Sequence, residues 1–159
     1  MSSLRSADVR GPIDHGSSFS LETIESAISD RKDAISLLAR MFLAAIFILS
    51  GYGKISGFEG TAGYIAQHAL PFPQLLTAIA IAIELGAGLA ILAGWKTRWA
   101  ALALIALLIV ITPIFHNFWS VPASEAMGQQ INFLKNASML GGMLLLLACG
   151  PGRYSVDRR

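Results

Sequence analysis

Residues 75–95 read LLTAIAIAIELGAGLAILAGW and contain almost only apolar side chains. This stretch is long enough to cross a bilayer as a helix, which takes about 20 apolar residues. One ionisable side chain, Glu84, stands near its middle. A charge at that depth costs several kcal/mol unless it is paired or neutral. Glu84 is therefore a candidate functional residue, and we expect it to face other helices.

Three further apolar stretches have the length of a membrane span. Together the four stretches predict an all-α integral membrane four-helix bundle over residues 34–150, with helices near 34–53, 75–95, 99–116 and 131–150. Of the 159 residues only 14% are charged, whereas soluble domains carry about 25%. The short connection at residues 96–98 predicts that the second and third helices form an antiparallel hairpin. The lipid bilayer is thus the first partner of the chain.

The two ends of the chain are polar. Residues 1–33 form a leader in which Leu21, Ile24 and Ile28 recur at helical spacing, with Ser20 in an N-cap position. This pattern is typical of a short amphipathic helix, and a weakly ordered leader is the alternative. Residues 151–159 form a basic tail.

The distribution of basic residues predicts the orientation in the membrane. Nine of the 12 lysines and arginines fall in the leader, the 96–98 turn and the tail: Arg5, Arg10, Arg31, Lys32, Lys96, Arg98, Arg153, Arg158 and Arg159. Loops rich in these residues stay in the cytoplasm. Both termini are therefore predicted to be cytoplasmic, and the loops at 55–73 and 117–130 to face the exterior.

Composition and motifs argue against several classes of function. The formal net charge of +2 is small and scattered, which does not favour nucleic-acid binding. The single cysteine, Cys149, allows no disulfide within the chain. No CxxC, HExxH or Walker-type motif is present, and we predict no metal site and no intrinsic cofactor.

Small residues mark the helix faces that are expected to pack. A stripe of small and polar residues runs along each apolar stretch, and small residues allow helices to approach closely in a membrane. The predicted packing residues are Ala44, Gly51, Ala80, Gly88, Gly141 and Gly142.

Arg40 is the predicted partner of Glu84. It lies on the same face of the first helix as Gly51 and Lys54, about 9 Å in from the cytoplasmic end at 1.5 Å per residue. The length of its side chain brings it within reach of Glu84, so we expect a buried ion pair. Such a pair either supports a site or only locks two helices together.

Three basic side chains fall at the exterior ends of their helices. Lys54, His116 and Lys135 have no acidic neighbour in sequence. With Glu84 they are candidates for a pocket that binds a quinone or a small anion, in which the imidazole of His116 can donate or accept a proton. The alternative is that the lysines reach to the membrane surface and His116 is simply polar.

Other polar residues of the spans have simpler expected roles. Asn132 and Asn136 are expected to bond to neighbouring helices, as asparagines in membrane helices usually do. Tyr52 and Tyr64 fall near the outer surface, where tyrosines anchor a protein at the interface between lipid and water.

Several segments carry a resemblance to a known family. FILSGYGKISGF at 47–58, IELGAGLAILAGWKTR at 83–98, LKNASMLGGMLLLL at 134–147 and GPGRYSVD at 150–157 together resemble the DoxX family of small four-helix membrane proteins. The resemblance covers roughly residues 35–157 and leaves out the leader. Matching positions include Arg40, Lys54, Glu84, His116, Lys135, Asn136 and Asp157.

The resemblance implies a multi-pass protein of the bacterial cytoplasmic (inner) membrane, often linked to redox systems. Our first hypothesis is a subunit or accessory of a quinone-linked redox system that binds a quinone or small anion and needs a redox partner. If the protein is catalytic, it is then a membrane oxidoreductase subunit. The alternative is a non-catalytic structural or assembly subunit of a larger membrane complex, and self-association is open in both.

Overall fold

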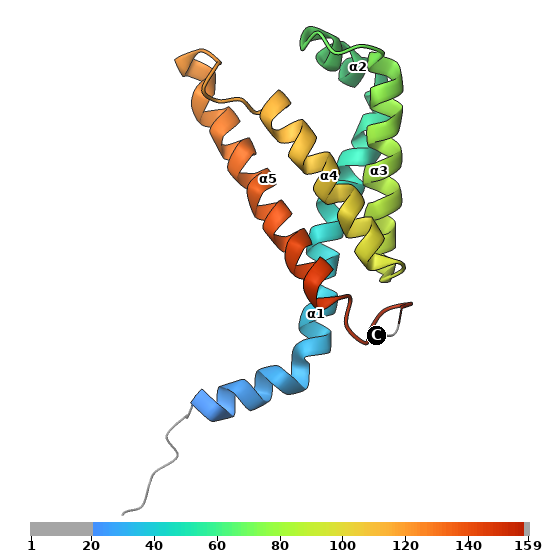
Figure 1. The fold of residues 1–159 in the computed structure, drawn as a ribbon, viewed down its shortest axis with the longest axis vertical. Coiled ribbons are helices and arrows are strands. Elements are labelled where there is room, and N and C mark those ends of the chain that lie inside the picture. Colours follow the sequence, from blue (N-terminus) through green and yellow to red (C-terminus); the bar gives the residue numbers. More distant parts are fainter. Residues whose placement is uncertain (1–20, 158–159) are drawn as a thin grey trace, which may run out of the picture. The chain divides into compact units, whose positions relative to one another are not determined.

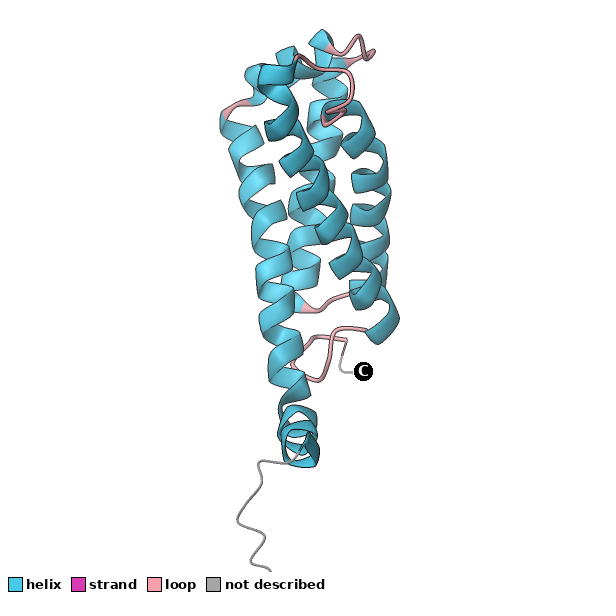
Figure 2. Cartoon of the chain, turned by 90° about the vertical axis from the view of Figure 1, so that its left-hand side faces the viewer, coloured by secondary structure: helices cyan, strands magenta, loops and turns pink. Residues whose placement is uncertain are grey.

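The computed structural model describes residues 21–157, and all regular structure in this range is α-helical (Figure 2). The elements are α1 (Leu21–Ser56), α2 (Phe58–Gln67), α3 (Pro73–Ala93), α4 (Thr97–Phe115) and α5 (Ala123–Cys149). Four helices are long and apolar enough to cross a membrane: α1 from Thr23, α3, α4 and α5. The prediction of an all-α protein with four spans is confirmed.

The chain divides into two units, residues 1–31 and residues 32–159. The part of the leader that is described, residues 21–31, is helical. Helix α1 thus begins well before residue 34, where the apolar pattern alone places the start of the first helix. Leu21 and Ile28 are both exposed, and the predicted N-cap Ser20 lies outside the described residues.

The second unit is a helical bundle in which α4 packs between α3 and α5 (Figure 1). Helices α1 and α3 run antiparallel with small residues at their contact. A Cβ added to Gly51 would lie 2.8 Å from Leu85 Cγ, and one added to Gly88 would lie 3.0 Å from Ile48 Cγ1. The absence of side chains at these glycines is what lets the two backbones approach.

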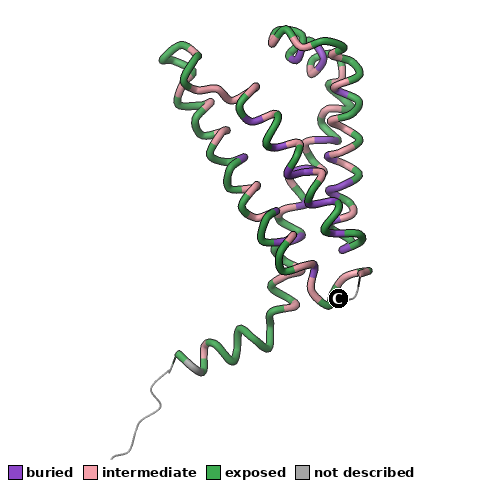
Figure 3. The backbone as a smooth tube through the Cα atoms, viewed as in Figure 1, coloured by how far each residue is buried: buried purple, intermediate pink, exposed green. Residues whose placement is uncertain are grey.

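Buried residues lie where the helices meet, and the outward sides of the helices are exposed (Figure 3). Many of the exposed residues are large and apolar. Ala44, Leu104 and Met143 are fully buried, whereas Phe42 and Leu145 are 78% and 68% exposed. Large exposed apolar side chains around a bundle are what a lipid environment requires. The same pattern would be costly for a protein surrounded by water.

Two of the predicted packing residues lie elsewhere: Gly141 faces no other helix, and Ala80 faces a pocket. Gly141 is exposed, and a Cβ added to it would meet no atom within 4 Å, while one added to its neighbour Gly142 would lie 2.8 Å from Leu43 Cδ2. Adjacent residues on a helix point about 100° apart, so only one of the two can face α1. Ala80 lines a pocket on the inner side of α3.

The turn between α3 and α4 is closed by the segment of residues 150–157, here called the tail segment. Backbone N–H groups of Val156 and Asp157 donate to the carbonyls of Ala93 and Gly94, at 3.1 and 2.9 Å. The carboxylate of Asp157 accepts from the backbone N–H groups of Lys96 and Thr97, at 2.9 and 3.0 Å. It therefore caps the positive end of α4.

We predict that Gly94→Ala destabilises this turn strongly. Gly94 has φ +69°, and an added Cβ would overlap Ser155 Cβ and Arg40 Nη1. The overlap and the left-handed backbone together cost about 2 kcal/mol of unfolding free energy. Denaturation of the full chain in mixed micelles measures the loss. Gly141→Ala is the matched control, and a loss as large in Gly141→Ala would contradict the argument.

Candidate functional site

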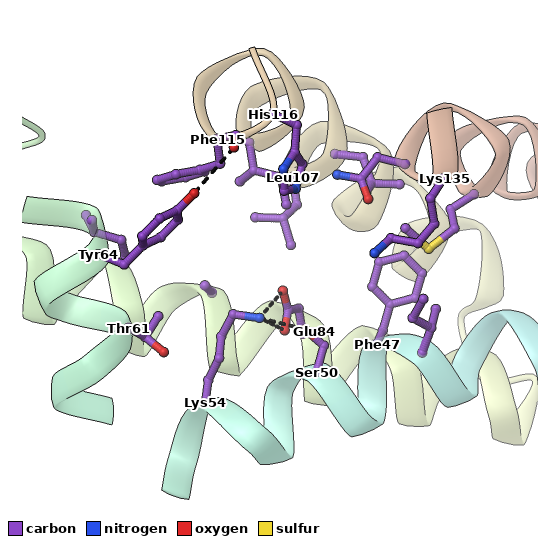
Figure 4. A pocket seen from close by; sticks show the side chains of 17 residues that line it. Phe47, Ser50, Lys54, Thr61, Tyr64, Glu84, Leu107, Phe115, His116 and Lys135 are labelled. Atoms are coloured by element: carbon purple, nitrogen blue, oxygen red, sulfur yellow. Dashed lines mark hydrogen bonds and ion pairs between the residues drawn. The ribbon is translucent and has the colours of Figure 1, made fainter. Parts of the chain in front are cut away.

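All four predicted ligand-binding residues line one pocket within the second unit. This central pocket has a volume of about 300 Å³ and receives side chains from each of the five helices. Lys54, Glu84, His116 and Lys135 point into it from four different segments (Figure 4). Most of the remaining lining is apolar or aromatic, including Ile46, Phe47, Leu107, Leu108, Ile111, Phe115 and Met139.

An ion pair between Lys54 and Glu84 forms one wall of the pocket. The Lys54 ammonium lies 3.0 Å from Oε1 and 2.8 Å from Oε2 of Glu84, and it also donates to Ser50 Oγ at 2.6 Å. Glu84 is 5% exposed and Lys54 is 25% exposed. The position of Gly51 directly opposite Glu84 brings α1 close enough for this contact. The pair makes this wall of the pocket polar, and the two charges of the pair cancel.

The structure corrects the predicted partner of Glu84, because Arg40 bonds elsewhere. Its Nη1 donates to the carbonyls of Ile91 and Leu92, at 3.1 and 3.2 Å, and its Nη2 donates to the carbonyl of Tyr154. The register of α1 against α3 explains the difference. Glu84 lies opposite Gly51, which follows Arg40 by eleven residues, or roughly 16 Å of helix. The position of a residue along its own helix can be estimated from the sequence of that helix, but the register between two helices cannot.

His116 and Lys135 each keep a nitrogen available to the pocket. His116 ends α4, and its Nδ1 lies 2.9 Å from Gln129 Oε1. Within residues 21–157 its other ring nitrogen has no hydrogen-bond partner. Lys135 is exposed and donates to Asn132 Oδ1 at 3.0 Å, so its charge meets only a neutral amide. Lys135 can therefore donate a hydrogen bond to a ligand. Because Nδ1 of His116 faces an oxygen and so carries a proton, the other ring nitrogen donates when the ring is protonated and accepts when it is neutral.

Asn136 links two helices beside the pocket. Its side-chain amide donates to Thr112 Oγ1 at 3.1 Å, and both residues are buried. This contact joins α5 to α4, as expected for an asparagine in a membrane helix. Asn132 differs, since its side-chain oxygen accepts a hydrogen bond from Lys135 on its own helix.

Helix α2 contributes residues that sequence reasoning missed. The loop predicted at 55–73 contains this ten-residue helix, which brings Thr61, Tyr64 and Ile65 to the pocket. Tyr64, which the sequence suggests as an interfacial anchor, stacks its ring on Phe115 with centroids 5.5 Å apart. The spacing of Thr61, Tyr64, Ile65 and His68 follows one face of a helix and is the signal that identifies α2.

The chemistry available in the pocket is that of hydrogen bonding and charge, set in an apolar wall. In the described range, His, Cys, Asp and Glu side chains form no group of three or more that could hold a metal ion. Ligand pockets of proteins are mostly apolar with a few placed polar groups and start at about 300 Å³. The central pocket has both features.

Comparisons with known proteins place the chain in a family. The DoxX family model matches residues 35–117. The chain is 37% identical over 128 residues to inner membrane protein YphA of Escherichia coli K12, covering 80% of this chain and 91% of that protein. It is 37% identical over 127 residues to inner membrane protein YqjF of the same organism, covering 80% and 92%. No solved structure matches the chain.

A shorter similarity extends to eukaryotes. The surfeit locus protein 4 homolog of Drosophila melanogaster is 34% identical over 67 residues, which is 40% of this chain and 24% of that protein. The family match and the two bacterial relatives cover most of the bundle, including Lys54 and Glu84. With four apolar spans, they identify a multi-pass protein of the bacterial inner membrane. The chain belongs to the DoxX family.

Proposed function

We propose that this protein binds the head group of a quinone in the central pocket and serves as a membrane subunit of a quinone-linked redox system. The observation that carries the proposal is the lining of the pocket. Aromatic and aliphatic side chains surround a charge-neutral pair, Lys54 and Glu84, and two further hydrogen-bonding groups, His116 and Lys135. In this proposal a separate redox subunit exchanges electrons with the bound quinone.

The lining favours a quinone over a small anion. A quinone head group is a flat, weakly polar ring with two carbonyl acceptors, and it matches aromatic walls such as Phe47, Tyr64 and Phe115. Lys135 can donate to those acceptors, and so can His116 in its protonated form. A small anion needs uncompensated positive charge. The more buried cation, Lys54, is already neutralised by Glu84 at 2.8 Å, and the remaining lysine, Lys135, is exposed to solvent.

We predict that Lys135→Ala and His116→Ala each weaken quinone binding about tenfold, because each removes a hydrogen-bonding group from the lining of the pocket. The measurement is isothermal titration calorimetry of decylubiquinone into the full chain in detergent micelles. Lys96→Ala is the matched control, since Lys96 lies at the other end of α4 and does not line the central pocket. Its affinity should equal that of the unsubstituted protein.

Unchanged affinity in both pocket variants would exclude the proposed site. Sodium sulfate serves as the small-anion probe in a parallel titration. Sulfate binding that depends on Lys135, without quinone binding, would assign the pocket to anions instead. If neither probe binds, and a stoichiometric native complex survives substitution of Lys54, Glu84 and Lys135, the structural-subunit hypothesis is the better one.

A further inference from the structure

A second pocket lies at the end of the bundle where the α3–α4 turn meets the tail segment. This hairpin pocket has a volume of about 330 Å³, and its lining includes Lys96, Arg98, Trp99, Gly150 and Asp157. Lys96 precedes α4 and His116 follows it, so the length of α4 separates this pocket from that end of the central one. An inference about it does not rest on the proposed function.

The hairpin pocket has an excess of positive charge. It is lined by two basic side chains and one acidic side chain. Among its partners in the described residues, the carboxylate of Asp157 accepts hydrogen bonds from the backbone N–H groups of Lys96 and Thr97 and from Thr97 Oγ1. It is thereby oriented toward the start of α4. Within residues 21–157, no hydrogen bond or ion pair occupies the side-chain nitrogens of Lys96 and Arg98.

Tryptophans place the pocket at the depth of lipid head groups. Trp95 ends the α3 side of the turn and is 53% exposed, and Trp99 lies in the first turn of α4 and is 73% exposed. Lys96 Nζ lies 5.3 Å from the centroid of the Trp95 ring. Exposed tryptophans at the ends of spans mark the boundary between acyl chains and water. Trp99 itself lines the pocket, so the cavity lies beside one of these exposed tryptophans.

We propose that the hairpin pocket binds the phosphate of an anionic phospholipid, with Lys96 and Arg98 as its ligands. Arginine and lysine both bind phosphate oxygens through charge-assisted hydrogen bonds. Basic pockets between membrane helices take anionic head groups in this way. A zwitterionic phospholipid brings its own cation and gains less from this pair. The acyl chains extend along the exposed apolar face beside Trp99.

The test compares lipid binding to the purified full chain by native mass spectrometry, with phosphatidylglycerol and phosphatidylcholine of the same acyl chains. Each basic residue near an anionic membrane contributes about fivefold to affinity. The unsubstituted protein should therefore prefer phosphatidylglycerol by about 25-fold, and Lys96→Gln/Arg98→Gln should remove this preference. Arg98→Gln alone should lower it about fivefold, which keeps a test if the double variant fails to fold.

Arg153→Gln is the matched control, because Arg153 is an exposed tail-segment residue that lines a different cavity. Its preference for phosphatidylglycerol should be unchanged. Equal loss in Arg153→Gln would mean diffuse attraction and would overturn the site. Inorganic phosphate at millimolar concentration is the competitor that separates the two sources of phosphate. If it displaces phosphatidylglycerol, the pocket is a free-phosphate site and the lipid assignment is wrong; failure to displace supports it.

Discussion

Replacing Lys54 with methionine is expected to lower the free energy of unfolding by about 3–5 kcal/mol. The change leaves the carboxylate of Glu84, which is 5% exposed, without its ion-pair partner. An uncompensated buried charge accounts for a loss of this size. Ser50 hydrogen-bonds Lys54 and not Glu84, so it does not replace the missing cation. Denaturation of the full chain in mixed detergent micelles measures the loss.

The double variant Lys54→Met/Glu84→Met should recover most of that stability, because both charges are removed and two apolar side chains of similar size take their place. Recovery to within about 1 kcal/mol of the unsubstituted protein is the expected outcome. A double variant as unstable as the single one would show that the loss comes from packing at Lys54 and not from the unpaired charge of its partner.

The second large effect is expected for Arg40→Met, at about 2–4 kcal/mol of unfolding free energy. Arg40 is 1% exposed, and its guanidinium donates to the carbonyls of Leu92, Ile91 and Tyr154. Ile91 O also accepts from the N–H of Gly94, so the carbonyls of Leu92 and Tyr154 depend most on Arg40. Both of these hydrogen bonds are partly buried, and a carbonyl that loses such a partner costs about 1–2 kcal/mol.

Arg153→Met is the control for this result, since it removes an exposed arginine from the same region and leaves the bond from its backbone N–H to Asp33 intact. Arg40→Lys should fall between the two, because an ammonium is a point donor and the planar guanidinium reaches several carbonyls at once. If Arg40→Lys were as stable as the unsubstituted protein, the several hydrogen bonds of the planar guanidinium would not explain the contribution of Arg40 to stability.

The spans and the inward side chains could be predicted because both follow from single helices. A run of apolar residues gives a helix, and a charge within it has to face protein. This argument needs no knowledge of the partner helix. It is sufficient to select Lys54, Glu84, His116 and Lys135, which line one pocket.

Contacts that depend on how two helices pack against each other could not be predicted from the sequence. Arg40 and Glu84 share an inward orientation, yet the glycines at 51 and 88 set a register that separates them by roughly 16 Å. The choice between Gly141 and Gly142 also depends on the rotation of α5 against α1. Helix α2 was missed because ten residues are too few for a strong pattern.

The tail segment has a consequence for the order of assembly during synthesis. Residues 150–157 follow the four candidate spans of the described residues, so the ribosome delivers them after these spans. Until then, Arg40 lacks its contact with the carbonyl of Tyr154, and the first N–H groups of α4 lack the Asp157 carboxylate. While the helices enter the bilayer, the end of the bundle at the α3–α4 turn is therefore not yet held by the tail segment. The helices can still shift relative to one another until the tail segment binds.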